Sequence, residues 1–92
     1  MGTLEKLISR KTKAHLKEVF ELEVEKLEFQ LTRKDFDGDI TLILFPLLKL
    51  TKQKSSFLGE TIGKSLVQNT FFVSEFNVVS GFLNLVISDI YY

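Results

Sequence analysis

The sequence predicts an α+β fold, a two-layer α/β sandwich with the element order α-β-β-α-β-β. Two stretches have apolar residues at helical spacing, and each is followed by a pair of stretches with strand-like alternation. Short connections within each pair make both pairs antiparallel hairpins. Because two helices can cover only one face of a four-stranded sheet, we expect the other face to stay open. At 92 residues, the chain is expected to be a single domain, residues 1–92, with little room for an enclosed active site.

Composition limits the possible functions. A hydrophobic fraction of 45% with nine Phe excludes simple disorder, and 12 basic against 12 acidic residues exclude a general polycation, so any nucleic-acid contact must be local. With no Cys and one His, the chain is expected to hold no disulfide and no metal. No apolar run reaches the roughly 18 residues of a membrane span and no signal-peptide pattern is present, so we expect no membrane contact and a cytoplasmic location.

The first helix is predicted from Thr3, its N-cap, to Phe20. His15 lies on its apolar stripe, where we expect a partly buried, hydrogen-bonded side chain rather than a catalytic one. Four basic residues crowd this helix and favour a solvated face, balanced by acids, over a phosphate site: Arg10, Lys11, Lys13 and Lys17.

Two strands are predicted next. Leu27 to Thr32 alternates apolar and polar residues, which is typical of a half-buried edge strand, with Leu31 on the apolar side. Ile40 to Phe45 is apolar on both faces, which indicates a central strand. The intervening Asp37-Gly38 marks a turn with a positive φ at Gly38, and the aspartates around it lack a calcium loop, so they are interpreted as turn and cap residues.

Pro46 offers no N–H to a ladder and is expected to end the strand, so that Leu47 to Lys54 forms a connector. The connector contains three lysines, Lys49, Lys52 and Lys54. Next to a surface that reads a base, these lysines would supply the sequence-independent attraction for phosphate. The alternative that these lysines only keep the surface soluble is weighed equally with a phosphate contact.

The second helix is predicted from about Phe57 to Asn69, with Ser55 or Ser56 as its N-cap. Gly59 and Gly63 lie on one side of it, and a small-residue groove lets a helix approach a sheet closely at a cost of about 1 kcal/mol for each glycine. The buried stripe is expected to contain Leu58, Ile62, Leu66 and Val67.

The stretch from Asn77 to Ser88 is predicted to be a β-hairpin closed by a two-residue turn at Ser80-Gly81. This turn sets the pairing, with Val79 opposite Phe82 and Asn77 opposite Asn84. Alternation then gives one apolar core face: Phe76, Val78, Leu83, Leu85 and Ile87.

The other face of the hairpin combines an aromatic ring with carboxamides. Phe82 and Asn84 are two residues apart, roughly 7 Å, on the same side of a strand. A ring can stack on an unstacked base while a carboxamide matches the hydrogen-bonding edge of an adenine. We therefore expect Phe82, Asn84 and Asn77 to contact a base.

The sequence also resembles a known family. G-F-L-N at Gly81 to Asn84, preceded by F-N-V-V, resembles the last hairpin of the N-terminal additional domain of arginyl-tRNA synthetases. Thr32 to Lys49, with Gly38-Asp39, is similar to the first hairpin of that domain. The resemblance covers nearly all of the chain, and the Gly-Phe-x-Asn box is its distinctive part. One difference is Val79-Ser80-Gly81 where many members have Gly-Pro-Gly before the aromatic residue.

The resemblance implies a domain that reads the D-loop at the outer corner of tRNA(Arg) and positions it for aminoacylation. Phe82 matches the position that packs on the D-loop base, and Asn84 matches the position that hydrogen-bonds it. The implied partners are tRNA(Arg) and the catalytic domain of the same chain, and no binding to DNA is expected. The implied parent is a class I arginine–tRNA ligase that uses ATP and magnesium, whereas this chain has neither of the class I nucleotide motifs and is expected to contain no catalytic residue and no cofactor site. The apolar end Ile90-Tyr91-Tyr92 is interpreted as a cut within that longer protein.

A second hypothesis belongs to another class. The open sheet face also carries three apolar side chains: Val79, Phe82 and Val86. If this face docks on a partner domain or on a second copy of the chain, the protein is a non-catalytic protein-interaction or homodimerisation module.

Overall fold

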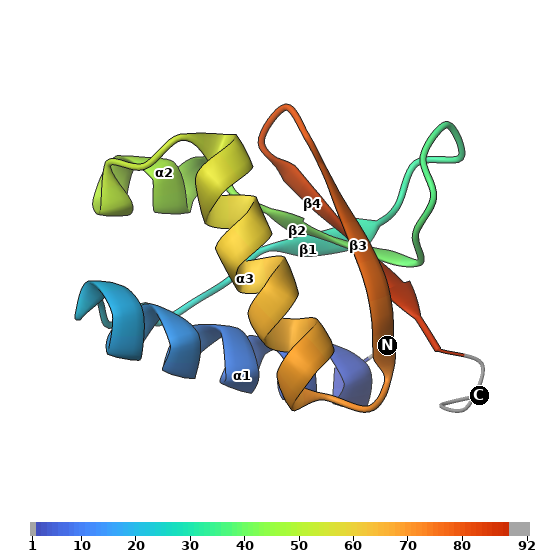
Figure 1. The fold of residues 1–92 in the computed structure, drawn as a ribbon, viewed down its shortest axis with the longest axis horizontal. Helices are drawn as coiled ribbons and strands as arrows, with labels where there is room; N and C mark the ends of the chain where they lie inside the picture. Colours follow the sequence, from blue (N-terminus) through green and yellow to red (C-terminus); the bar gives the residue numbers. More distant parts are fainter. Residues whose placement is uncertain (1, 89–92) are drawn as a thin grey trace.

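Two long helices, α1 (Gly2–Phe20) and α3 (Ser55–Asn69), lie on one face of a four-stranded antiparallel sheet (Figure 1). The computed structural model describes the backbone of residues 2–88 and the side chains of residues 4–88. The sheet has the order β1-β2-β4-β3, formed by β1 (Phe29–Leu31), β2 (Ile40–Ile43), β3 (Val73–Val79) and β4 (Phe82–Ile87). The predicted α+β sandwich is confirmed, with β1 at an edge and β2 in the interior of the sheet.

The prediction of a connector without secondary structure after Pro46 was wrong. Residues Phe45–Thr51 form a short helix, α2, so the element order is α-β-β-α-α-β-β. Proline lacks the N–H that the first turn of a helix leaves unpaired, so Pro46 begins a helix here. Leu47 is buried beneath it, and Lys52, in the left-handed conformation, caps it by donating its N–H to the carbonyl of Leu48.

Other predicted boundaries also need correction. The N-cap of α3 is Lys54 rather than Ser55 or Ser56, since both serines lie within the helix. Helix α1 already includes Gly2, while the side chain of Thr3 and the segment Ile90-Tyr91-Tyr92 lie outside the described part of the chain.

The edge strand is less covered than its alternation predicted. Leu31, placed on the apolar side, is 67% exposed. It stands at the end of a three-residue strand that has a neighbour on one side only, so little of the molecule reaches it.

The C-terminal hairpin has the predicted register. Asn77 pairs with Asn84 and Val79 with Phe82. The turn residues Ser80 and Gly81 have φ values of 41° and 86°, both in the left-handed region that a two-residue hairpin turn requires. Gly38 also has the predicted positive φ, 150°.

The core lies between the helices and the inward face of the sheet. It contains Ile8 and Leu16 from α1, the predicted stripe of α3, and alternate residues of the inner strands: Leu58, Ile62, Leu66, Ile40, Leu42, Leu83 and Leu85. Val67 packs against this cluster while half-buried. The two glycines of α3 meet β3, because a Cβ on Gly59 would lie 2.7 Å from Val78 and one on Gly63 would lie 2.4 Å from the ring of Phe76. The close approach of helix to sheet is therefore confirmed.

Candidate nucleic-acid interface

The helix-free face of the sheet carries a pocket of about 220 Å³ at the end where β3 turns into β4. Strands β1, β2 and β4, together with Val79 at the end of β3, contribute side chains that alternation directs away from the core. The connection from β1 to β2 and the β3–β4 turn complete the wall. The lining residues are Gln30, Arg33, Phe36, Thr41, Val79, Ser80, Phe82 and Asn84.

The predicted aromatic residue lies in this pocket. Phe82 is half-buried, and its ring is perpendicular to that of Phe45 at the start of α2, with the centroids 5.4 Å apart. The backbone N–H of Leu44 donates to the carbonyl of Gly81 at 2.9 Å, which ties the start of α2 to the hairpin turn. Phe82 is thus held from behind by the helix that sequence reasoning missed.

Asn84 also lines the pocket, but it is far less exposed than its position on an open face suggested. Only 2% of the residue is accessible. Its Oδ1 accepts a hydrogen bond from the hydroxyl of Thr41 at 2.6 Å, and its Nδ2 donates to Oδ1 of Asn77 at 2.8 Å. Asn84 is therefore the least exposed of the three predicted base-contacting residues.

Asn77, the third of these residues, is not part of the pocket wall. It is half-buried, and while its Oδ1 accepts from Asn84, its Nδ2 donates to the backbone carbonyl of Asp37 at 2.7 Å. Both ends of this amide are used within the protein. The structure thus brings Asn77 and Asn84 together, as the pairing predicted, but it places only Asn84 against the pocket.

The connection between β1 and β2 explains the low exposure of Asn84. It folds over the helix-free face of the sheet, so that a Cβ on Gly38 would lie 3.2 Å from the Cβ of Asn84. This face is therefore free of helices but partly covered by a loop. The flat apolar surface that a protein-interaction module would use is reduced, since Val79, Phe82 and Val86 are all half-buried.

Sequence reasoning did not assign the other lining residues to a base-binding site, and two of them, Arg33 and Phe36, offer chemistry suited to a nucleotide. Both are exposed residues of the β1–β2 connection, for which the sequence predicts only a turn. Their sequence signal was a cation and an aromatic side chain beside Asp37-Gly38, in a loop where such residues seldom serve the core. Among the lining residues, Arg33 is the one cation and there is no carboxylate.

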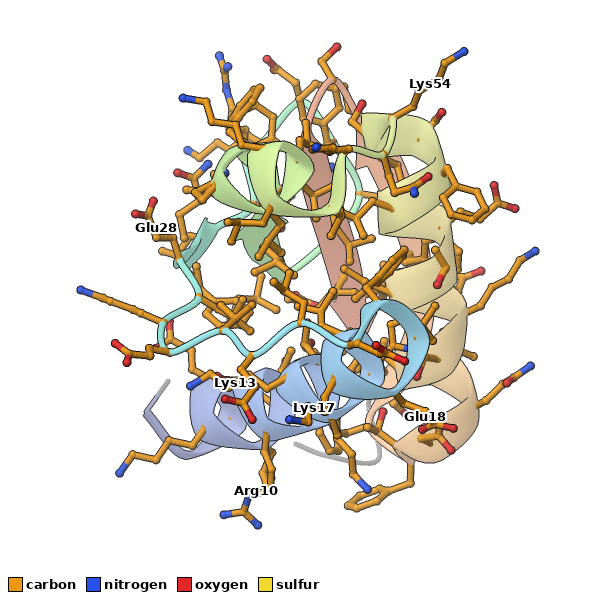
Figure 2. All side chains as sticks on the ribbon, turned by 90° about the vertical axis from the view of Figure 1, so that its left-hand side faces the viewer. Arg10, Lys13, Lys17, Glu18, Glu28 and Lys54 are labelled. Carbon is orange, nitrogen blue, oxygen red and sulfur yellow. The ribbon has the colours of Figure 1, made fainter. Side chains whose placement is uncertain are left out.

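The three lysines lie on and just after α2. Lys49, Lys52 and Lys54 are all exposed, and Lys54 extends from the start of α3 at the end of the molecule away from α1 (Figure 2). The same view places Arg10 at the opposite end, on α1. The basic residues of α1 and those around α2 therefore form separate surfaces.

On α1, two of the basic side chains have local partners. Lys17 forms an ion pair with Glu23, and Lys13 donates to the carbonyl of Glu25 at 2.6 Å. Both contacts join α1 to the segment that follows it, and the ion pair with Glu23 favours the predicted solvated face, balanced by acids, over a phosphate site.

His15 has the predicted environment. It is half-buried, and its Nε2 lies 2.6 Å from the hydroxyl of Thr61 on α3. Burial lowers the pKa of His15 below its ordinary value, although the nearby charge of Glu18 acts in the opposite direction. This contact joins the two long helices.

Among residues 2–88, no three His, Cys, Asp or Glu side chains gather where they could hold a metal ion. Within the same residues, no helix is long and apolar enough to span a bilayer. The fold and the pocket define a small α+β domain with a candidate binding site on the helix-free face of its sheet.

Comparison with known proteins identifies the family of this domain. Residues 4–87 match the family described as the arginyl tRNA synthetase N terminal domain. The chain is 46% identical to the arginine–tRNA ligase of Flavobacterium psychrophilum over 98% of its own length, and 38% identical to that of Parabacteroides distasonis over 82%. These alignments cover 17% and 13% of the two ligases, so the chain spans about a sixth of the length of these relatives.

A solved structure agrees with this. The arginyl-tRNA synthetase of Thermus thermophilus superimposes with a TM-score of 0.74 and 25% sequence identity, over 90% of this chain and 14% of that one. The chain belongs to the arginyl-tRNA synthetase N-terminal domain family, which confirms the resemblance seen in the sequence.

Proposed function

We propose that this chain, residues 1–92, is the tRNA-reading N-terminal domain of an arginine–tRNA ligase, and that the pocket beside Phe82 takes an unpaired D-loop base of tRNA(Arg). The pocket itself is the observation that carries the proposal. Its volume of about 220 Å³ is below the range of pockets that hold whole drug-sized ligands, and it suits a single ring system. Two aromatic residues, Phe36 and Phe82, line it, and aromatic side chains are what single-stranded RNA bases stack on.

The chemistry of Asn84 fits edge recognition within this pocket. An amide group offers two donor hydrogens and two acceptor lone pairs, and each of its polar atoms makes one hydrogen bond in the structure. One hydrogen and one lone pair are left. A base stacked on Phe82 with its edge towards Asn84 would meet a donor and an acceptor together, which is the pattern that an adenine edge complements.

Cations around the pocket would hold the backbone of the same nucleotide strand. Arg33 lies in the pocket wall, and a guanidinium binds phosphate oxygens in a bidentate manner. Helix α2 and the start of α3 lie at the end of the molecule that carries the β3–β4 turn (Figure 1). Lys49, Lys52 and Lys54, which belong to these elements, would add attraction that is independent of sequence.

The chemical step would take place elsewhere in the parent protein. The chain covers 17% of its Flavobacterium psychrophilum relative, so ATP, magnesium and the aminoacylation site are assigned to a catalytic domain outside residues 1–92. That domain and tRNA(Arg) are the proposed partners, and the cytoplasm is the proposed location.

The decisive experiment measures aminoacylation by a ligase that carries this domain. The substrates are four tRNA(Arg) transcripts that differ only in the base at the unpaired D-loop position. Asn84→Ala is expected to remove on the order of 1–3 kcal/mol of preference among the four, expressed as the ratio of their kcat/KM values. Phe82→Ala is expected to weaken all four by roughly 1–3 kcal/mol through lost stacking.

A matched control is Gln68→Ala, an exposed change on α3 away from the pocket, which should leave every ratio unchanged. The KM values for ATP and arginine should stay near those of the unmodified ligase in all variants. Equal slowing of the four transcripts by Asn84→Ala would assign the amide a purely structural role. If Phe82→Ala left tRNA binding unchanged while promoting or preventing dimer formation, the interaction-module hypothesis would replace this proposal.

A further inference from the structure

Four polar side chains form a continuous hydrogen-bonded row across the sheet. The hydroxyls of Thr32 and Thr41 are 2.8 Å apart, Thr41 Oγ1 is 2.6 Å from Asn84 Oδ1, and Asn84 Nδ2 is 2.8 Å from Asn77 Oδ1. The row ends where Asn77 Nδ2 meets the backbone carbonyl of Asp37 at 2.7 Å. Thr32 directly follows β1, and the other three side chains come from β2, β4 and β3.

The last contact sets the direction of every other one. A backbone carbonyl can only accept, so the atom of Asn77 that faces Asp37 must be its NH₂ group. The oxygen of Asn77 then faces Asn84 and requires the NH₂ group of Asn84. Asn84 consequently turns its oxygen to Thr41, whose single hydroxyl hydrogen is used there, and Thr32 must donate to Thr41.

The row is also protected from water. Thr41 is 1% exposed and Asn84 2%, so neither can readily exchange its partner for a solvent molecule. Turning the amide of Asn84 by 180° would put oxygen against oxygen at Asn77, whose own orientation is fixed by the carbonyl of Asp37. In a buried site that contact is costly. The Thr41 hydroxyl could follow the turn by accepting from Asn84 and donating to Thr32, so Asn77 fixes the orientation, while Thr41 holds the oxygen of Asn84 in place.

We propose that Asn77 and Thr41 are positioning residues for Asn84: Asn77 fixes the orientation of the amide, Thr41 holds its oxygen in place, and together they set which base edge the pocket accepts. The proposal rests on the function proposed above. With its orientation fixed, Asn84 presents its remaining hydrogen at the β3 side and its remaining lone pair at the β2 side of the pocket. A base with the matching acceptor and donor is accepted, and one with the reverse arrangement is rejected.

Paired variants of the ligase that carries this domain test the proposal with the same four tRNA(Arg) transcripts. Thr41→Val keeps the side-chain volume and removes the donor to Asn84, and we expect the preference for the best base to fall about fivefold, the equivalent of one hydrogen bond. Thr41→Ser keeps the hydroxyl and should restore the preference to within about twofold of the unmodified ligase.

Thr32→Val is the matched control within the row. It removes one hydrogen bond but leaves the Thr41 hydroxyl donating to Asn84, so base preference should stay within about twofold while the thermal midpoint falls. Asn77→Ala removes the oxygen that accepts from the Asn84 amide and should reproduce the fivefold loss of preference. This variant tests the same proposal if Thr41→Val does not fold.

The outcomes separate this inference from the proposed function. If Asn84→Ala changes the base preference but Thr41→Val and Asn77→Ala slow all four transcripts by one common factor, the positioning role is overturned and base reading stands. If Thr32→Val alters the preference as much as Thr41→Val, the row acts through general stability and the inference is again wrong. If Asn84→Ala leaves the preference unchanged, base reading fails and the inference fails with it.

Discussion

The rings of Phe45 and Phe82 lie perpendicular to each other with their centroids 5.4 Å apart, so the first residue of α2 braces the aromatic wall of the pocket. Such an edge-to-face pair contributes about 0.5–1.5 kcal/mol beyond its buried area. Because Phe45 is 51% exposed, we expect Phe45→Ala to cost little stability but to lower tRNA affinity by releasing Phe82. Direct binding of tRNA(Arg) and the thermal midpoint measure the two effects.

Phe57→Ala is the control for this prediction, because Phe57 is an equally exposed aromatic residue on α3, at 54%, and is absent from the pocket wall. Equal losses of affinity in the two variants would show that the surface attracts tRNA through apolar area in general, and that Phe45 has no particular role in holding Phe82.

The two faces of β4 should differ sharply in their contribution to stability. Leu83 and Leu85 are fully buried beneath the helices, so replacing either one by Ala should destabilise the fold by about 2–5 kcal/mol through lost burial and a cavity. Phe82→Ala should cost far less, since Phe82 is only half-buried. Denaturant unfolding gives the ranking, and a larger loss for Phe82 would mean that this ring belongs to the core.

The register of the C-terminal hairpin was predictable because it depends on four neighbouring residues. The turn Ser80-Gly81 needs two left-handed residues, and once it is placed, alternation determines which side chain lies opposite which. The approach of α3 to β3 was predictable for a similar reason, since Gly59 and Gly63 provide the groove within one helix.

The burial of Asn84 was not predictable in this way. It depends on Gly38 and Asp37 folding over the sheet, and the bond between Asp37 and Asn77 joins residues 40 positions apart. Helix α2 was missed for another reason. The residue type at Pro46 ends a strand and begins a helix equally well, and only the burial of Leu47 distinguishes the two.

Gly63→Ala should destabilise the domain even though alanine is the better helix former. In an exposed helix the change would gain about 1 kcal/mol. Here the added methyl group would lie 2.4 Å from the ring of Phe76, so either α3 or β3 must shift. The chemical-denaturation midpoint should fall, whereas Gln68→Ala on the exposed side of the same helix should leave it nearly unchanged. A stabilised Gly63→Ala variant would contradict the close packing of helix and sheet.

His15 should make the stability of the fold depend on pH. Burial lowers its pKa in the folded state, so the folded protein favours the neutral ring more than the unfolded chain does. The resulting stabilisation is fully present above the unfolded pKa of about 6.5 and is lost as the pH falls through the lower, folded pKa. Charged neighbours are Glu18 on the same helix and Lys64 on α3, which borders the same surface hollow.

Unfolding free energies measured from pH 7.5 to pH 5 test this dependence. The measurement is made on the domain within the intact ligase, and its unfolding free energy should fall as the pH is lowered over this range. His15→Gln keeps a hydrogen-bonding group near Thr61, and its unfolding free energy should depend less steeply on pH. Identical slopes would mean that protonation of His15 does not discriminate between the folded and unfolded states.

Replacing Lys49, Lys52 and Lys54 together by Gln should weaken the binding of any tRNA and flatten its dependence on salt. Each phosphate contact contributes about 0.7–0.9 to the slope of log K against log salt, so three contacts would reduce that slope by roughly 2–3. Preference among the D-loop bases should remain, because a lysine–phosphate contact carries no base information. The control replaces three exposed basic residues of α1 by Gln: Lys6, Arg10 and Lys11. Arg10 lies at the opposite end of the molecule from Lys54 (Figure 2).

A smaller change of the salt dependence in this control would localise the phosphate contacts to the α2 end of the molecule. If the variant lacking Lys49, Lys52 and Lys54 kept its affinity at low salt, those lysines would serve only to solvate the surface.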